Sequence, residues 1–210
     1  MKSLALFDFD GTITTRDTFS QFLIYLMSPP RLMLESIILG PIYMAYLLKF
    51  ISNNTAKGTA LKRVLSGYRE EKLLSLGRDF YEQRCRNLIR PEALNRIQWH
   101  KDEGHDVVLV SASVGFWLFP FAEEYGLDLI CTKVKSDKGI CLGELDGLNC
   151  FGPEKVRRVQ EKYDFSKYKE VYAYGDTRGD KEMLEAAQIA FFKPFRGAKS
   201  ETPMQNWETR

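Results

Sequence analysis

The sequence is poor in the residues that build zinc and disulfide sites. Its 210 residues include only 4 cysteines and 2 histidines. No two cysteines form a Cys-x-x-Cys pair, and His100 and His105 lie in a different segment from the cysteines. A zinc site is therefore not expected, and the cysteines are predicted to be free thiols in a reducing cytoplasm.

A charge excess and a leader segment are also missing. Lys and Arg total 30 and Asp and Glu total 28, so the formal net charge is only +2. That balance gives no reason to expect a nucleic-acid partner. The first three residues lead directly into an apolar run, without the long hydrophobic region and cleavage site of a signal peptide. We therefore expect a cytoplasmic protein.

The hydrophobic pattern from residue 91 to 195 alternates between helical and extended segments. Such alternation predicts an α/β fold with a parallel sheet covered by helices. Residues 4–7 form a further apolar strand, and residues 16–90 read almost wholly as helix, so a helical segment is inserted after the first strand. Residues 133–149 are rich in Gly, Asp and Lys and are expected to form a hairpin or loop. The expected helices are 91–103, 115–125, 153–163 and 179–187, and the expected strands are 106–110, 129–132, 171–174 and Ile189–Phe192.

Two acidic strings follow apolar strands. Asp8-Phe9-Asp10-Gly11-Thr12 follows residues 4–7, and Gly175-Asp176-Thr177-Arg178-Gly179-Asp180 follows residues 171–174. Fully apolar strands suit a parallel sheet, and the carboxyl edge of such a sheet holds the ligand crevice. Four acids at one edge repel one another unless a divalent cation lies among them or some carry a proton.

Two further residues are weaker candidates for the same site. Ser111 ends the apolar run 107–110, and Lys155 lies in Gly152-Pro153-Glu154-Lys155 at a helix start. Taken alone, Ser111 is a turn residue, Lys155 is a solvated lysine on a charged helix, and Asp180 is an N-terminal helix acid. The functional interpretation depends on all of them occurring together with Asp8 and Asp10.

Together these motifs resemble those of the haloacid dehalogenase (HAD) superfamily phosphatases, in the phosphoserine-phosphatase-like branch (subfamily IB). The four motifs occur in the expected order, and the resemblance covers roughly residues 4–195. It implies a Rossmann-like catalytic core from residues 1–15 and 91–195 and a helical cap of the C1 type from residues 16–90. The tail, residues 196–210, is polar and is expected to be poorly ordered.

The resemblance also implies a role for each motif residue. Asp8 would attack phosphorus and form an aspartyl-phosphate, which divides one difficult step into two. Asp10 would protonate the leaving group and then accept a proton from water. Phosphate would be bound by the turn at Gly11, by the hydroxyl of Ser111 and by the cation of Lys155.

Magnesium is the cofactor that the resemblance implies. Asp8, Asp176 and the main-chain oxygen of Asp10 would hold Mg²⁺, with Asp180 as a further ligand or as support for one. The implied reaction is hydrolysis of a phosphomonoester. Two alternatives stay open: a phosphotransferase that passes the phosphoryl group to an alcohol, and a non-catalytic phosphate-binding protein.

Two cap residues are candidates for substrate recognition. Phosphoserine phosphatases carry a glutamate nine residues after the nucleophile, and Asp17 stands at that position here. The string Leu61-Lys62-Arg63-Val64 resembles the arginine motif of that family, which points to Arg63. Asp17 is equally suited to be the N-cap of a helix over residues 19–27.

Residues 32–51 are the most apolar part of the cap. Thirteen uncharged residues separate Glu35 from Lys49, whereas a membrane span needs about 20 apolar residues. Pro41 would also kink a helix there. The segment is interpreted as a buried cap helix, a homodimer contact, or a lipid-facing surface at the inner face of the membrane. A similar apolar cap occurs in bacterial phosphatidylglycerophosphatase C, so the substrate is either a small phosphoserine-like metabolite or a lipid phosphate.

Overall fold

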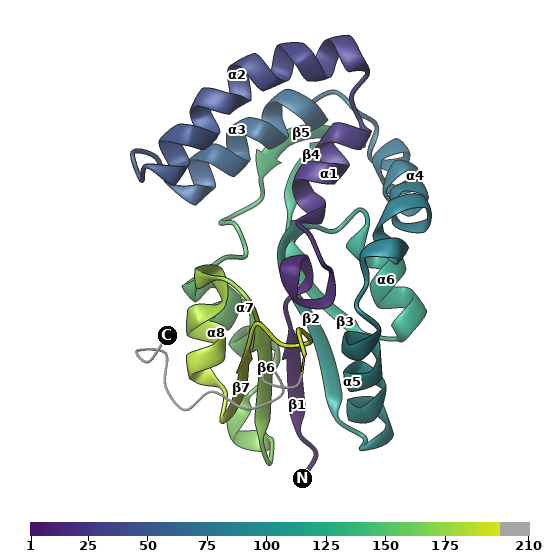
Figure 1. The fold of residues 1–210 in the computed structure, drawn as a ribbon, viewed down its shortest axis with the longest axis vertical. Helices are drawn as coiled ribbons and strands as arrows, with labels where there is room; N and C mark the ends of the chain where they lie inside the picture. The colour runs from purple at the N-terminus through teal and green to yellow at the C-terminus, as the bar shows by residue number, and fades with distance from the viewer. Residues whose placement is uncertain (198–210) are drawn as a thin grey trace.

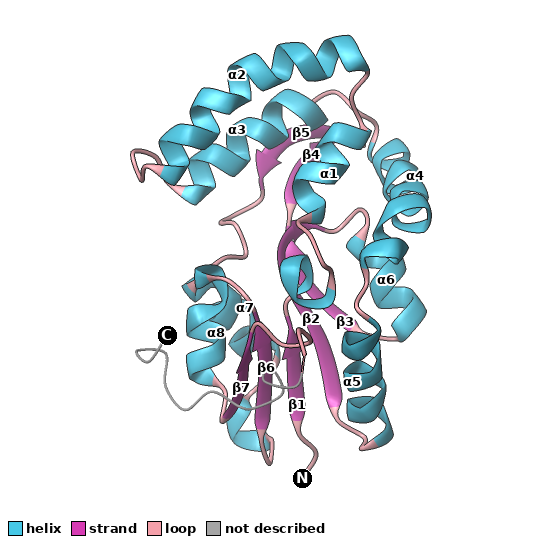
Figure 2. Cartoon of the chain, in the orientation of Figure 1, coloured by secondary structure: helices cyan, strands magenta, loops and turns pink. Residues whose placement is uncertain are grey.

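A five-stranded parallel sheet forms the centre of the protein in this computed structural model, which describes residues 1–197 (Figures 1 and 2). The strand order is β3-β2-β1-β6-β7, with β1 in the middle. This confirms the predicted α/β fold with a parallel sheet. The bounds are β1 Leu4–Phe7, β2 Asp106–Val114, β3 Asp128–Thr132, β6 Val171–Gly175 and β7 Ile189–Phe192.

Helices cover both faces of the sheet, which explains why its strands are apolar on both sides. Alternate residues of β1 enter opposite layers of the core: Phe7 belongs to one hydrophobic cluster and Leu6 to the other. On one face lie α5 Pro91–Asp102 and α6 Leu118–Tyr125, and on the other α7 Pro153–Lys162 and α8 Lys181–Ala186. Short helical turns lie at η4 Phe165–Lys167 and η5 Arg178–Asp180.

The segment between β1 and α5 is helical, as predicted. It contains the four helices α1 Thr18–Tyr25, α2 Pro29–Leu47, α3 Asn53–Leu65 and α4 Glu70–Phe80. An irregular turn, η1 Phe9–Ile13, precedes them, and η2 Tyr81–Cys85 and η3 Arg86–Leu88 follow them. Figure 1 shows α2 and α3 at the end of the molecule beyond the carboxyl edge of the sheet.

The expected hairpin at residues 133–149 is present as β4 Val134–Asp137 and β5 Ile140–Leu145. It lies against α3 and away from the central sheet (Figure 1). Cys141 exchanges main-chain hydrogen bonds with the turn after α3: its N–H donates to Tyr68 O at 2.8 Å, and its oxygen accepts from Gly67 N at 2.9 Å. The hairpin therefore packs with the inserted helices although it follows β3 in sequence.

Of the three interpretations of the apolar segment 32–51, a buried cap helix does not fit the structure. Helix α2 continues through Pro41, and within one chain its only buried residue is Glu35. Its large apolar side chains are exposed, among them Met33 at 71 %, Ile37 at 65 % and Met44 at 52 %. No helix within residues 1–197 is long and apolar enough to cross a membrane. Of the predicted tail, residues 198–210 lie outside the described residues.

Candidate active site

The carboxyl ends of β1, β2 and β6 bring the predicted site residues to one edge of the sheet. Asp8 follows β1 directly, and its main-chain N–H donates to Tyr174 O of β6 at 2.9 Å. Ser111 lies in β2, which extends beyond the predicted end at residue 110. Asp176 follows β6, and Lys155 extends from α7. Asp8, Ser111 and Lys155 are all at least 95 % buried, since their exposed fractions are 5 %, 0 % and 1 %.

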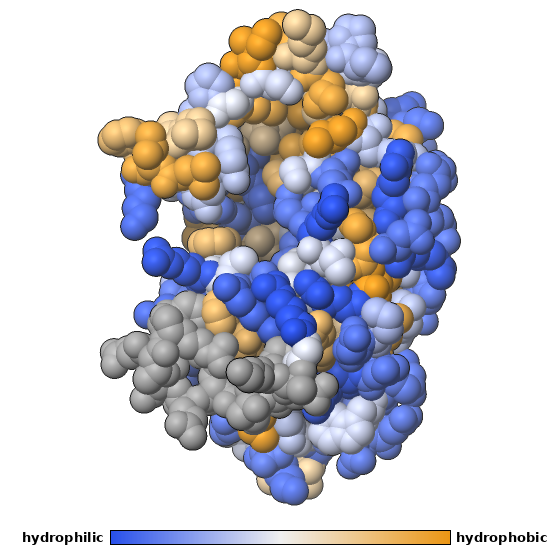
Figure 3. All heavy atoms as spheres, in the orientation of Figure 1, coloured by the Kyte–Doolittle hydropathy of each residue, from blue (hydrophilic) through white to orange (hydrophobic). Residues whose placement is uncertain are grey.

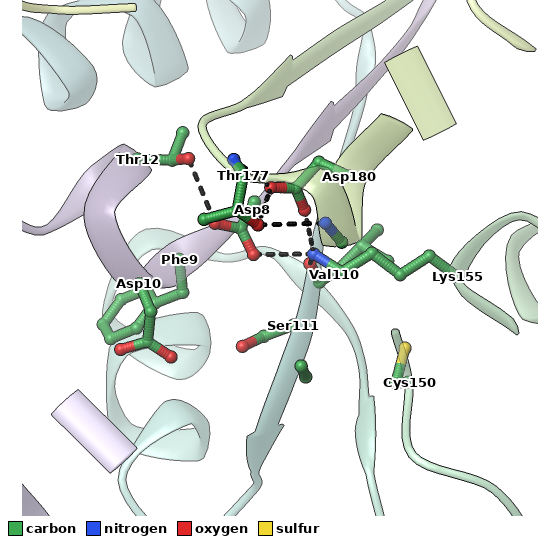
Figure 4. A network of polar contacts seen from close by, with 12 residues as sticks. Asp8, Phe9, Asp10, Thr12, Val110, Ser111, Cys150, Lys155, Thr177 and Asp180 are labelled. Atoms are coloured by element: carbon green, nitrogen blue, oxygen red, sulfur yellow. Dashed lines mark hydrogen bonds and ion pairs between the residues drawn. The ribbon is translucent and has the colours of Figure 1, made fainter. Parts of the chain in front are cut away.

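Lys155 is the electrostatic centre of the site (Figure 4). Its Nζ donates to Asp8 Oδ1 at 2.6 Å, to Asp180 Oδ1 at 2.6 Å and to Val110 O at 2.9 Å. Although burial lowers the pKa of Lys155, the charges of Asp180 and Asp8 raise it above its ordinary value. The lysine is therefore a fixed cation that offsets two buried carboxylates.

Asp180 holds the loop after β6 in place. Its Oδ2 accepts hydrogen bonds from the main-chain N–H groups of Asp176 and Thr177 at 3.1 and 3.0 Å, and from the Thr177 hydroxyl at 3.0 Å. Its Oδ1 faces Lys155. Both carboxylate oxygens of Asp180 are thus used to position Asp176 and Lys155.

Gly11 lets the turn after β1 approach the loop after β6. Its φ is +81°, in the left-handed region that favours glycine. A Cβ at this position would lie 2.4 Å from Asp176 Oδ2, so a side chain there would collide with a predicted metal ligand. The glycine of the first motif is therefore required by the close approach of this turn to Asp176.

Asp10 points to a different part of the site from Asp8. Its Oδ1 accepts from Thr18 N at 2.6 Å and from Thr18 Oγ1 at 2.5 Å, and its Oδ2 accepts from Ser113 Oγ at 2.5 Å. Burial and the charge of Asp17 raise the pKa of Asp10, although the hydrogen bonds from Ser113 and Thr18 lower it. A positioned carboxyl group with a raised pKa is suited to donate a proton.

The acidic residues fit a divalent cation. Oxygens of Asp8, Asp176 and Asp180 all lie within 4.8 Å of one another. Asp176 Oδ1 is buried and has no hydrogen-bond partner among residues 1–197, so it needs a ligand of another kind. Burial and the nearby charge of Asp180 raise the pKa of Asp8 well above its ordinary value, which a cation among these groups would reverse.

The two predicted cap residues have different surroundings. Asp17 lines the cavity that contains Asp8, and its Oδ2 also accepts from Ser20 N at 3.0 Å as the N-cap of α1. Arg63 does not line that cavity. Its Nε donates to Glu35 Oε2 of α2 at 2.5 Å, because Glu35 is the nearest buried acid on the facing helix. The structure therefore does not bring Arg63 together with the other predicted site residues.

Three residues near the site were missed by the sequence analysis. Ser113 follows Ser111 by two positions in β2, and its Oγ donates to Asp10 Oδ2, so the strand period could have suggested it. Lys57 of α3 lines the cavity, and nothing in its sequence context marks it. Arg196, assigned to the tail, donates to Gly11 O at 2.8 Å and pairs with Asp176 Oδ2 at 2.9 Å.

One cavity of about 720 Å³ contains the predicted catalytic groups. At its inner end are Asp8, Asp10, Lys155 and Asp176, and at its outer end are residues of α2 and α3. A larger cavity of about 1010 Å³ lies by β3 and α7 and contains none of the predicted site residues. The outer wall of the site cavity is apolar and aromatic, formed by Leu39, Ile42, Tyr43 and Tyr46.

The fold and the site together define an α/β enzyme with a carboxylate centre at the edge of a parallel sheet and helices inserted after the first strand. Comparison with known proteins is consistent with this class. The family model of the haloacid dehalogenase-like hydrolases matches residues 5–185. The chain belongs to the haloacid dehalogenase-like hydrolases.

Similar proteins support the assignment. The chain is 36 % identical over 196 residues to Protein CicA of Caulobacter vibrioides. The aligned region covers 92 % of this chain and 87 % of CicA. A Bordetella pertussis protein of unknown function has a similar structure, with a TM-score of 0.81, 23 % identity, and coverage of 90 % and 89 % of the two chains. A phosphoserine phosphohydrolase-like protein of Francisella tularensis has a TM-score of 0.66 at 20 % identity, with coverage of 90 % and 86 %. The two solved structures share the fold.

Proposed function

We propose that this hydrolase is a magnesium-dependent phosphatase that cleaves a phosphomonoester through phosphorylated Asp8. One observation carries the proposal: Lys155 joins Asp8 and Asp180 in a buried cluster whose third acid, Asp176, has an unpartnered buried oxygen. Such a cluster costs stability in the absence of a ligand, because burial and like charge both disfavour the carboxylates. The name of the Francisella relative, a phosphoserine phosphohydrolase-like protein, supports the same reaction class.

The residues of the chain suit both half-reactions. Asp8 is the nucleophile, and Lys155 keeps its carboxylate in place and offsets the charge that the phosphoryl group brings. Asp10 donates a proton to the departing oxygen, and Thr18 and Ser113 fix its orientation. In the second half-reaction Asp10 takes a proton from a water molecule whose oxygen attacks phosphorus, and the bond between Asp8 and phosphorus breaks to release inorganic phosphate. Ser111, whose hydroxyl accepts from Ser113 N at 3.0 Å, can donate its proton to a phosphoryl oxygen.

Asp8 and Asp176, with the main-chain oxygen of Asp10, are the proposed Mg²⁺ ligands. Bound there, the ion would lessen the repulsion between an anionic nucleophile and an anionic substrate. Asp180 supports the site indirectly because its two oxygens are already bonded to Lys155 and to the loop that carries Asp176. We further propose that residues 16–90 act as a cap over this site.

For the substrate we favour a phosphomonoester with an apolar body over a phosphoserine-like metabolite. The cavity that contains Asp8 continues to Leu39, Ile42, Tyr43 and Tyr46 of α2. The arginine expected to bind a substrate carboxylate is instead paired with Glu35. An apolar wall next to a polar catalytic end matches an amphiphile whose phosphate lies at Asp8.

The outer surface of α2 is proposed to contact a lipid bilayer. On this helix the buried position is charged and the exposed positions are apolar, the reverse of an ordinary surface helix. Figure 3 shows the hydrophobic side chains gathered over α2 at the top of the molecule. Tyr43 is 59 % exposed and also lines the site cavity, so the apolar surface and the cavity are continuous. Lys49, just after α2, is exposed next to this surface and suits anionic headgroups.

The reaction is tested with an aryl phosphate. We expect hydrolysis that requires Mg²⁺ and stops when EDTA is added. Asp8→Asn should abolish turnover because an amide is not a competent nucleophile. An Asp8→Asn protein that kept wild-type turnover would exclude the covalent route, and wild-type turnover in EDTA would exclude the metal.

The surface is tested by sedimentation with anionic liposomes. The wild-type protein should bind, and Met44→Glu and Ile37→Glu should reduce both binding and hydrolysis of a lipid phosphate in vesicles. The control Leu148→Glu changes a side chain that is likewise exposed, at 56 %, and lies outside the site cavity. It should bind like wild type. A wild-type protein that stays in the supernatant and sediments as a dimer in the ultracentrifuge would assign this surface to a second copy instead.

A further inference from the structure

Lys57 is a cation of the inserted helices that reaches the core. It lies in α3, and its Nζ donates to the main-chain oxygen of Ala112 in β2 at 2.6 Å. The same Nζ lies 4.4 Å from the centre of the Phe19 ring of α1. Ala112 stands between Ser111 and Ser113, so the ammonium group is held beside the strand end that serves the phosphate and Asp10.

The ammonium group of Lys57 retains capacity to bind a ligand. It has three N–H donors. Among residues 1–197 one of them is used by Ala112 O, and the Phe19 ring face is the other contact. Lys155, by comparison, uses its donors on Asp8, Asp180 and Val110. Lys57 and Lys155 line the same cavity, so the lysine from α3 is the one with a donor available to the substrate.

The surroundings of Lys57 favour an anion as that ligand. Burial lowers its pKa to about 8, while the charges of Asp10 and Asp17 raise it and the charge of Lys155 lowers it. A cation that has lost part of its hydration gains more from a negatively charged oxygen than from a neutral one. Lys57 bonds to Ala112, and the next residue, Ser113, bonds to Asp10. Because Asp10 serves the leaving group in the proposed reaction, Lys57 lies on the leaving-group side of the site.

We propose that Lys57 is a specificity-determining residue that binds a second anionic oxygen, carried by the leaving group next to the phosphomonoester. This rests on the proposed function and specifies its substrate: a phosphomonoester with a carboxylate or phosphodiester group within a few bonds of the ester oxygen. The apolar part of the substrate would then lie beyond Lys57, along α2. Lys57 takes the recognition role that the sequence suggested for Arg63, which is bound to Glu35.

The test compares two small substrates that differ at one carbon. Glycerol 3-phosphate and 3-phosphoglycerate share a three-carbon phosphomonoester, and only the second carries a carboxylate. Wild type should have the higher kcat/KM for 3-phosphoglycerate. Lys57→Met should lower the ratio of the two kcat/KM values about tenfold, the size expected of one charge-assisted hydrogen bond. Lys57→Arg should keep the preference.

Lys62→Met is the matched control. Lys62 lies on the same helix, but it is exposed, pairs with Glu144 and does not line the site cavity. The Lys62→Met protein should have the same ratio of the two kcat/KM values as wild type. If turnover of the two small substrates is too slow to measure, their competitive inhibition constants against p-nitrophenyl phosphate give the same ratio. A second measurement does not depend on the Lys57→Met variant. Above pH 8 the preference of wild type for 3-phosphoglycerate should decline as Lys57 loses its proton, and the preference of Lys57→Arg should not.

Two results would overturn the assignment. One is a wild-type enzyme without preference for the carboxylate. The other is a Lys57→Met protein with wild-type thermal stability that loses activity equally on both substrates, which would make Lys57 an anchor between α3 and Ala112. Failure to hydrolyse p-nitrophenyl phosphate at all would instead refute the proposed phosphatase activity, so the two failures are distinguishable.

Discussion

Replacing Lys155 with methionine should destabilise the protein more than any exposed lysine substitution. The side chain is 1 % exposed and donates to two carboxylates and one main-chain oxygen. Lys155→Met keeps the length of the apolar stem and removes the cation. Asp8 and Asp180 are then left facing each other without compensation.

The expected cost follows from the burial of those partners. Removing one member of a buried ion pair costs roughly 3 to 5 kcal/mol, because the remaining charge stays desolvated. For a chain of this size each kcal/mol lowers Tm by roughly 2 to 4 °C, so we expect a decrease of roughly 6 to 20 °C. The cost should be smaller at pH 5 than at pH 8. Burial and the charge of Asp180 raise the pKa of Asp8 in the folded state, and protonation of Asp8 at low pH relieves the repulsion between the two carboxyl groups.

Thermal melts followed by circular dichroism measure this effect. The control is Lys162→Met on the same helix, whose exposed pair with Asp128 should contribute about 1 kcal/mol or less. Adding Asp180→Asn to Lys155→Met should recover part of the loss, since one of the two repelling charges is removed. Two results would refute the central role of Lys155. One is a Lys155→Met protein with the same Tm as Lys162→Met. The other is a Lys155→Met, Asp180→Asn double variant with a lower Tm than Lys155→Met alone.

Three further predictions concern chemistry, metal and pH. Asp10→Asn should slow hydrolysis of alkyl phosphates much more than that of activated aryl phosphates, since only the poor leaving group needs a proton; equal losses would remove the acid role. Vanadate should bind tightly only with Mg²⁺, as measured by calorimetry, and tight binding to protein in EDTA would contradict the assigned metal site. Burial and the neighbouring His105 lower the pKa of His100 from 6.5 to about 3, so its contribution to stability is complete above pH 6.5 and is lost as pH falls toward 3. Unfolding free energy should therefore be lower by about 2 kcal/mol at pH 5 than at pH 7.5, and His100→Gln, read by urea titration, should remove that difference.

Much of the core could be predicted because its strands are short apolar runs followed by acids. The predicted strands 4–7 and 189–192 match β1 and β7, and the acids after β1 and β6 meet at the sheet edge as expected. Parallel pairing dictates this result, since it aligns the carboxyl ends of neighbouring strands. The family resemblance was confirmed by the family model over residues 5–185.

The inserted helices were harder to predict because their contacts depend on tertiary pairing. Arg63 matches a family motif in sequence, but Glu35, on the helix packed against it, takes its guanidinium. Lys57, six residues or about 1.7 turns earlier on α3, lines the cavity instead. Arg196 reaches Asp176 from the far end of the chain, a contact that local pattern cannot reveal. For α2, the sequence left a buried helix, a dimer contact and a lipid-facing surface open, because an apolar run has the same pattern in all three; its apolar side chains are exposed.

Chemical trapping of phosphorylated Asp8 tests the central claim most directly. The enzyme is mixed with a phosphomonoester and Mg²⁺, quenched in acid during turnover and reduced with borohydride, which converts an aspartyl-phosphate to homoserine. Peptide mass spectrometry should find homoserine at residue 8 and aspartate at residues 10, 176 and 180. Sustained hydrolysis with no homoserine at residue 8, in samples where a known aspartyl-phosphate is trapped under the same conditions, would contradict the account.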